Sequence, residues 1–168
     1  GSTASNTDGT ITSTVSANTT AGFSIVSYTG NGTAGATIGH SLGQKPDMMI
    51  IKTRDSVNHF FVYHTSLGAT KHILVNETDA AASFTVTWND TEPTSSVFSV
   101  GTSFGTNKSG DNYIGYCFTE KKGYSKFGSY TGNANNDGAF IYLGFKPAFF
   151  MVKKTDATDD WRMFDNKR

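Results

Sequence analysis

A five-residue segment occurs twice in the chain, and similar residues follow each copy. Residues 27–31 read Ser-Tyr-Thr-Gly-Asn, and residues 129–133 repeat them letter for letter. The second copy begins 102 residues after the first. A repeat at a fixed spacing is the usual sign of a duplicated supersecondary unit, and it must be recognised before any fold is argued. We therefore interpret the chain as carrying two copies of a strand-loop-strand unit, which is more common in binding and structural proteins than in enzymes.

The residues after each copy also correspond. Leu-Gly-Gln-Lys-Pro at 42–46 precedes an apolar run at 48–51, and Leu-Gly-Phe-Lys-Pro at 143–147 precedes an apolar run at 149–152. Proline suits the start of a strand and not its middle, because it has no backbone N–H to donate to the ladder. Neither apolar run alternates with polar residues, so both faces of each strand are apolar. The sequence predicts that these two runs are the most deeply buried strands.

Composition favours strands and turns over helices. Aromatic residues make up 13% of the chain and there are 18 glycines, which suits strands separated by tight turns. From Phe23 onward, strand signals recur at intervals of about 8–12 residues. The sequence predicts an all-β fold: an antiparallel β-sandwich of jelly-roll or lectin-like type, built from two quasi-repeated halves. The predicted strands are 23–28, 48–54, 60–64, 72–75, 84–88, 97–100, 113–118, 126–130, 140–143, 149–154 and 162–164.

The domain organisation follows from the repeat and from one polar segment. Residues 1–20 are mostly Gly, Ser, Thr, Ala, Asn and Asp, so we expect a flexible linker or an extended arm. Residues 21–168 are expected to form a single β-sandwich domain with its repeat at 23–64 and 124–168. Residues 65–123 have no counterpart after the second copy. Either the duplication is partial, or the chain is a fragment that stops inside a second unit, and the sequence alone does not decide between them. Separately, the start at Gly1-Ser2 without methionine suggests an excised or tagged fragment.

Charge and hydropathy exclude two classes of partner. The formal net charge is zero and the isoelectric point is near 7.1, so there is no basic surface to hold a phosphate backbone and we expect no nucleic-acid partner. No apolar run approaches the roughly 18 residues of a membrane span, so we expect no membrane insertion. Cys117 is the single cysteine and lies in an apolar run. We expect it in the core rather than at a reactive site.

No residue pattern points to catalysis, a cofactor or a metal. The sequence contains no nucleophile elbow and no glycine-rich phosphate loop. The histidines at 40, 59, 64 and 72 lack metal-ligand spacing. Residues 133–138 imitate the first half of a calcium loop, but Gly144 stands where the bidentate acid belongs. We therefore expect no catalytic residues, no cofactor and no metal, and we interpret 133–138 as a turn.

Aromatic residues beside amides and acids are the remaining candidates for a binding site. Such groups make sugar sites, because rings stack on C–H faces while polar groups bind hydroxyls. Trp88 is the candidate stacking platform, and the alternative is that Trp88 closes the core and the neighbouring acid only solvates a turn. If a glycan binds, we expect it at loops between strands. The candidate ligand-binding residues are Trp88, Asn89, Asp90, Tyr130, Asn133 and Asp137.

Residues 22–168 resemble a known family in several ordered blocks. The blocks include GFSIVSYTGN at 22–31, NKSGDNYIGYCFTEKKGYSKFGSYTGN at 107–133, FKPAFFMVKKTD at 145–156 and WRMFDNKR at 161–168. They resemble a module in tail-fibre and other virion proteins of marine tailed bacteriophages. The resemblance implies a position on the virion or its tail, and it supplies no binding residues.

Together these observations predict a phage tail-fibre or virion structural module that displays a surface for a host-receptor glycan. Its expected partners are other virion or tail proteins and a host surface glycan, and its location is the outer face of the virion. Because fibre proteins are usually trimers, we expect a homotrimer in which residues 1–20 extend along a neighbour. The alternative is a carbohydrate-binding module of a secreted bacterial adhesin, and the third hypothesis is an enzyme acting on surface polysaccharide.

Overall fold

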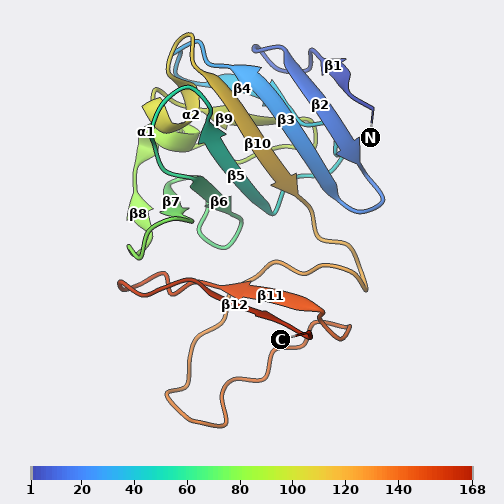
Figure 1. The fold of residues 1–168 in the computed structure, drawn as a ribbon, viewed down its shortest axis with the longest axis vertical. Helices are drawn as coiled ribbons and strands as arrows, with labels where there is room; N and C mark the ends of the chain where they lie inside the picture. Colours follow the sequence, from blue (N-terminus) through green and yellow to red (C-terminus); the bar gives the residue numbers. More distant parts are fainter. Residues whose placement is uncertain (1, 168) are drawn as a thin grey trace.

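Antiparallel strands dominate the computed structural model of the chain, which describes residues 2–167 (Figure 1). Eight strands form one sheet in the order β1-β2-β3-β10-β5-β6-β7-β8. The strand of this sheet that comes last in the sequence, β10, therefore lies inside the sheet, between β3 and β5. The all-β, antiparallel prediction is confirmed. The strands are β1 Ala4–Asn6, β2 Ser13–Asn18, β3 Phe23–Thr29, β5 Met48–Thr53, β6 Phe61–His64, β7 Lys71–Leu74, β8 Ala82–Ser83 and β10 Asn112–Phe118.

A second, two-stranded sheet packs against one face of the main sheet. It consists of β4 Ala36–Gly39 and β9 Val97–Val100, and two single-turn helices, α1 Thr85–Trp88 and α2 Phe104–Asn107, lie beside it. Apolar side chains from both sheets form one buried cluster between them. Its fully buried members include Val26, Ile38, Ile51, Tyr63, Trp88, Phe98, Val100, Tyr113 and Cys117. Cys117 is thus in the core, as predicted.

The other face of β5, β6 and β7 is covered by a C-terminal hairpin. This hairpin is formed by β11 Phe149–Val152 and β12 Arg162–Asp165, and Figure 1 shows it below the main sheet. Met151 and Trp161 pack against a second buried cluster made of Met48, Val62 and Ile73. The indole Nε1 of Trp161 also donates a hydrogen bond to the Leu74 carbonyl oxygen at 2.8 Å. Apolar packing and a directional bond thus attach the hairpin to the main sheet.

The β11–β12 hairpin has the same strand register as the β5–β6 hairpin. Met49 pairs with Tyr63 in the first hairpin, and Phe150 pairs with Phe164 in the second. Every paired position in the second hairpin carries a number 101 higher than its equivalent in the first. Register is set by the apolar pattern and by the loop. The sequence match at 48–51 and 149–152 is therefore accompanied by a match in pairing.

The prediction of deep burial holds for one apolar run and fails for the other. In β5, Met49 is 1% exposed and Ile51 is fully buried. In β11, Phe149 is 58% exposed and Phe150 is 48% exposed, so this part of the prediction was wrong. The physical reason is the missing neighbour: β10 covers the second edge of β5, whereas β11 pairs with β12 alone among residues 2–167.

Two predicted strands of the second copy are absent. Residues 126–130 and 140–143 run as irregular chain between β10 and β11. Their counterparts in the first copy, β3 and β4, are held by β2, β10 and β9. Within residues 2–167, no strands take those places beside the second copy. A strand without a ladder partner leaves its backbone groups to water, so the same local sequence does not form one.

The predicted strand at 84–88 is wrong, because residues 85–88 form helix α1. Thr87 and Trp88 are both buried, at 0% and 1% exposure. Successive strand residues point to opposite faces, whereas one helical turn directs both of these side chains inward. Thr87 Oγ1 reaches His72 Nδ1 at 3.2 Å, and Trp88 Nε1 donates to the Lys71 carbonyl oxygen at 3.1 Å. Tertiary contacts override the alternating pattern here.

The prediction of a flexible arm at residues 1–20 was also wrong. Residues 13–18 are strand β2, which pairs antiparallel with β3, and β1 pairs with β2. Ile11 and Val15 belong to the main core at 8% and 3% exposure. Few apolar anchors suffice because an existing sheet edge supplies hydrogen bonds for a polar strand.

Candidate functional site

Trp88 is unavailable as a stacking platform. Its side chain is 1% exposed, and its ring meets Tyr63 edge to face with the centroids 6.1 Å apart. A ring that stacks on a sugar must present one open face. The structure agrees with the other interpretation of the sequence, in which Trp88 closes the core.

Asn89 and Asp90 shape the turn that follows helix α1. Both have positive φ, 55° and 47°, a conformation that Asn and Asp tolerate better than other non-glycine residues. Asn89 donates to Thr91 Oγ1 at 3.4 Å, and Asp90 is exposed. These two residues adjoin Trp88 in sequence, but its ring points into the core. The three therefore form no joint binding surface.

Tyr130, Asn133 and Asp137 lie on the irregular segment between β10 and β11, shown in orange in Figure 1. Asn133 Oδ1 accepts the Asn135 backbone N–H at 3.1 Å, and Asn135 Oδ1 accepts that of Asp137 at 3.0 Å. Such side-chain-to-backbone bonds two residues apart form local turns. Tyr130 is 55% exposed. No group of three His, Cys, Asp or Glu residues within 2–167 is placed to hold a metal ion.

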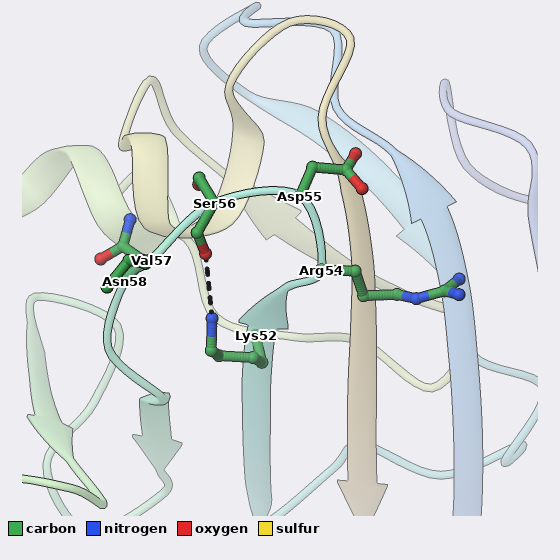
Figure 2. Close-up of a pocket in the computed structure, with 6 residues that line it drawn as sticks. All are labelled: Lys52, Arg54, Asp55, Ser56, Val57 and Asn58. Carbon is green, nitrogen blue, oxygen red and sulfur yellow. Dashed lines mark hydrogen bonds between the residues drawn. The ribbon is translucent and has the colours of Figure 1, made fainter.

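A shallow concave surface of about 460 Å³ is formed by the loop between β5 and β6 (Figure 2). The loop is folded on itself: Lys52 Nζ donates to the carbonyl oxygens of Thr53 at 2.8 Å and Ser56 at 3.3 Å. The same ammonium lies 5.7 Å from the centre of the Phe60 ring. Figure 2 shows Arg54 extending away from Lys52 across the sheet. The lining residues are Lys52, Arg54, Asp55, Ser56, Val57 and Asn58.

Hydrogen bonds tie this loop to the start of β10. Asp55 Oδ2 accepts the Asn112 backbone N–H at 2.6 Å and its side-chain amide at 2.9 Å. Ser56 Oγ donates to Asp111 Oδ2 at 3.4 Å, and Lys108 Nζ lies 3.0 Å from Asp111 Oδ1. Each of these polar groups already has a hydrogen-bond or ion-pair partner within the protein. The hydrogen bonds fix the loop against the start of β10.

A buried amide holds the neighbouring loop. Asn107 is fully buried, and its Oδ1 accepts the Asn31 backbone N–H at 2.9 Å. Its Nδ2 donates to the carbonyl oxygens of Thr33 at 2.9 Å and Gly101 at 2.8 Å. All of these bonds are local to the sheet end that carries the β5–β6 loop. A satisfied buried amide fixes loop positions because breaking any one bond leaves a buried polar group unpaired.

A second, smaller concavity of about 240 Å³ has an aromatic lining. Phe23 and Phe118 lie with ring centroids 4.9 Å apart, and Phe127 lies 6.2 Å from Phe118. Tyr124, at 68% exposure, and the hydroxyl residue Ser125 complete its rim. An exposed ring beside hydroxyls can contact a sugar ring. The sequence analysis did not identify this set of residues. The feature that indicates it is the spacing of the two aromatic residues in Gly-Tyr-Ser-Lys-Phe, at residues 123–127 after β10.

Burial controls the titration of the groups that most often carry chemistry. Desolvation lowers the pKa of His40, His64 and His72 from its ordinary value, which favours their neutral forms. Desolvation raises the pKa of the Cys117 thiol to about 12. The nucleophilic species of cysteine is the thiolate, so Cys117 stays an unreactive core residue at neutral pH.

A family model described as a domain of unknown function, DUF7483, matches residues 1–168. No curated protein matches the chain, and no solved structure matches it. Among residues 2–167, no helix is long and apolar enough to cross a membrane.

Proposed function

The chain belongs to the DUF7483 family, a domain of unknown function, and from that premise we propose that it is a non-enzymatic structural module of a phage tail fibre or virion. Its partners in this proposal are other virion or tail proteins and a host surface glycan, and its place is the outer face of the virion. The resemblance of residues 22–168 to virion modules of marine tailed phages supports this placement.

The observation that carries the proposal is the exposed aromatic surface of the C-terminal hairpin. Phe149 is 58% exposed and Phe150 48% in β11, while Met163 is 64% exposed and Phe164 50% in β12. Phe150 and Phe164 pair across the hairpin and stack with centroids 4.6 Å apart, so they form one exposed aromatic pair on the same face. Single apolar residues are normal on a surface, but adjoining large ones mark an interaction site. A module that presents such a group is suited to assembly with other chains.

The proposal includes the finer description of the fold. We infer that the main sheet and the β4–β9 sheet form the two layers of a β-sandwich, and that 23–64 and 124–168 are quasi-repeated halves. The shared register of the β5–β6 and β11–β12 hairpins supports this. The homotrimer stays part of the proposal, but not through an extended arm, because strands β1 and β2 of the N-terminal segment belong to the main sheet.

The test is to locate the protein in particles. Antibodies against residues 2–167 are applied to purified phage particles from the genome that encodes the chain, and bound antibody is imaged by electron microscopy. Labelling of the tail or fibre supports the proposal. Labelling of a bacterial surface, with unlabelled particles, would instead favour the adhesin.

The alternative function, a carbohydrate-binding module of a secreted bacterial adhesin, is favoured by the aromatic concavity around Tyr124. A glycan array probed with wild type, Tyr124→Ala and Tyr142→Ala tests whether this concavity binds glycan. Tyr142 is a control because it is equally a tyrosine, 78% exposed, and does not line the concavity. Binding lost only in Tyr124→Ala supports a glycan site there, which the virion module and the adhesin module share and the particle labelling then separates; release of shortened glycan would indicate the polysaccharide enzyme.

A further inference from the structure

Both edges of the β5–β6 hairpin have a neighbouring strand, whereas within residues 2–167 no strand lies along the outer edge of β11. In the first hairpin, β10 pairs along β5 and β7 pairs along β6. In the second, β11 and β12 form a sheet of two strands within residues 2–167. An open edge presents a row of unpaired backbone groups and accepts a further strand readily. The first hairpin shows which strand belongs at the β11 edge.

The apolar face of β11 also lacks the cover that its counterpart has. Met49 and Tyr63 point into the main core at 1% and 0% exposure. At the equivalent positions, Phe150 and Phe164 stack with centroids 4.6 Å apart, and both remain about half exposed. Met151, next in the chain, packs toward the main sheet. Since successive residues alternate sides, the Phe150 side faces away from the main sheet.

A third difference between the two copies concerns the tyrosine of the repeated Ser-Tyr-Thr-Gly-Asn segment. In the first copy, Tyr28 stacks on Tyr113 of β10 with centroids 5.1 Å apart and is 3% exposed. In the second copy, the equivalent residue is Tyr130, which is 55% exposed. The open edge of β11 and the exposed Tyr130 correspond to two contacts that β10 makes in the first copy. The uncovered Phe150 corresponds to Met49, which the layer containing β4, β9 and α1 covers in the first copy.

We propose that the free edge of β11 is a docking site for an extended polypeptide strand with the residue pattern of β10, bound by antiparallel strand addition. By the register of the first hairpin, a small residue equivalent to Cys117 lies opposite Phe150, and one equivalent to Gly115 lies opposite Val152. A tyrosine equivalent to Tyr113 reaches Tyr130. Backbone hydrogen bonds supply affinity in this mode, and alternate side chains supply specificity. Once the strand docks, residues 126–130 have a neighbouring strand to pair with, as β3 has β10. The inference does not depend on the virion placement.

The probe is a synthetic peptide with the sequence of residues 110–120, carrying C117A so that it cannot form disulfides. The control peptide adds I114P and Y116P, because proline removes ladder donors and is excluded from paired strand interiors. Binding to the full chain is measured by fluorescence anisotropy. We expect the first peptide to bind and the proline peptide to fail.

Hydrogen exchange locates the bound peptide. The amides of 149–152 and 126–130 should gain protection, while those of β3 and β5 should not change, because β10 already occupies their edges. Tyr130→Ala should weaken binding about 2- to 10-fold, the range for a lost aromatic pair. Tyr142→Ala is the matched control, because Tyr142 is an exposed tyrosine outside the repeated segment, and it should bind as wild type does.

Three results would overturn the proposal. One is no binding by a chain that circular dichroism shows to be folded. Another is protection confined to strands other than β11. The third is self-association detected by sedimentation, with 149–152 already protected in the absence of peptide, since a second copy would then occupy the edge.

Discussion

Tyr28 stacks on Tyr113 in the core, with ring centroids 5.1 Å apart and planes inclined by 13°. The hydroxyl of Tyr28 donates to the Thr106 carbonyl oxygen at 2.6 Å, deep in the structure. Tyr130 has the same four neighbours in sequence but is 55% exposed. One local sequence thus occupies two environments, and the chain contains its own matched controls.

Tyr28→Phe should destabilise the protein by about 1–3 kcal/mol, because it leaves the buried Thr106 carbonyl oxygen without its donor. Tyr130→Phe should change the free energy of unfolding by less than about 0.5 kcal/mol, as for most exposed substitutions. Urea denaturation of both variants measures the difference. Equal losses would mean that the hydroxyl of Tyr28 contributes nothing beyond its ring.

Gly30→Ala and Gly132→Ala provide a second matched pair. A Cβ on Gly30 would collide with the Lys108 carbonyl oxygen and approach the Tyr113 ring, whereas nothing lies within 4 Å of that position on Gly132. We expect a loss of more than about 1 kcal/mol for Gly30→Ala, by the overpacking mechanism. Gly132→Ala should be close to neutral. Thermal melting compares the two, and a costly Gly132→Ala would contradict the open environment of the second copy.

Trp88→Ala should reduce stability by about 3–5 kcal/mol, because it removes a large, fully buried ring and leaves a cavity. The indole also loses its bond to the Lys71 carbonyl oxygen. Any ligand binding should be lost together with folding. A variant that melts like wild type but no longer binds a glycan would restore Trp88 as a site residue.

Glu92 should make stability depend on pH in the acidic range. Burial acts to raise the pKa of Glu92, but hydrogen bonds from Lys45, Tyr63 and the Ala69 backbone N–H outweigh it and lower the pKa. A carboxyl with a lowered folded pKa stabilises the protein above its unfolded pKa, and this contribution disappears as pH falls through the folded value. Glu92→Gln should therefore be less stable than wild type near pH 7, by less than about 1 kcal/mol for such an exposed pair.

The test of the Glu92 prediction is a pair of denaturation curves. The stability gap between wild type and Glu92→Gln should begin to shrink as the pH falls below the unfolded pKa of glutamate, and it should close below the lowered folded pKa of Glu92. A gap that is constant with pH would show that the loss in Glu92→Gln comes from geometry and not from charge.

Three strands of the first copy, β3, β5 and β6, could be predicted because local pattern and tertiary partners agree there, whereas β4 was missed. The apolar run at 48–51 lies between β10 and β6, as its two apolar faces require. The identical argument failed at 149–152, since burial depends on neighbours that a local pattern does not contain. The polar strand β2 was missed for the converse reason: its hydrogen bonds to β3 hold it despite a composition typical of linkers.

The candidate site was harder to predict than the fold. The residues that follow Trp88 in sequence, Asn89 and Asp90, are of the types found in sugar sites. A single helical turn nevertheless directs the Trp88 ring into the core. Tyr124 is exposed because the chain turns after β10, and the sequence gives no direct sign of which aromatic side chains a turn leaves outside. Pairing partners and turn geometry, rather than residue type, decided both outcomes.

The central position of β10 has a consequence for how the chain folds during synthesis. Translation delivers β3 and β5 long before residue 118, so their facing edges stay unjoined while the intervening residues are made. The first copy must therefore pass through a nascent stage with open edges, and long-range closure of this kind is slow and prone to misassembly. Within residues 2–167 the outer edge of β11 stays in the open state that β5 has only until β10 is made.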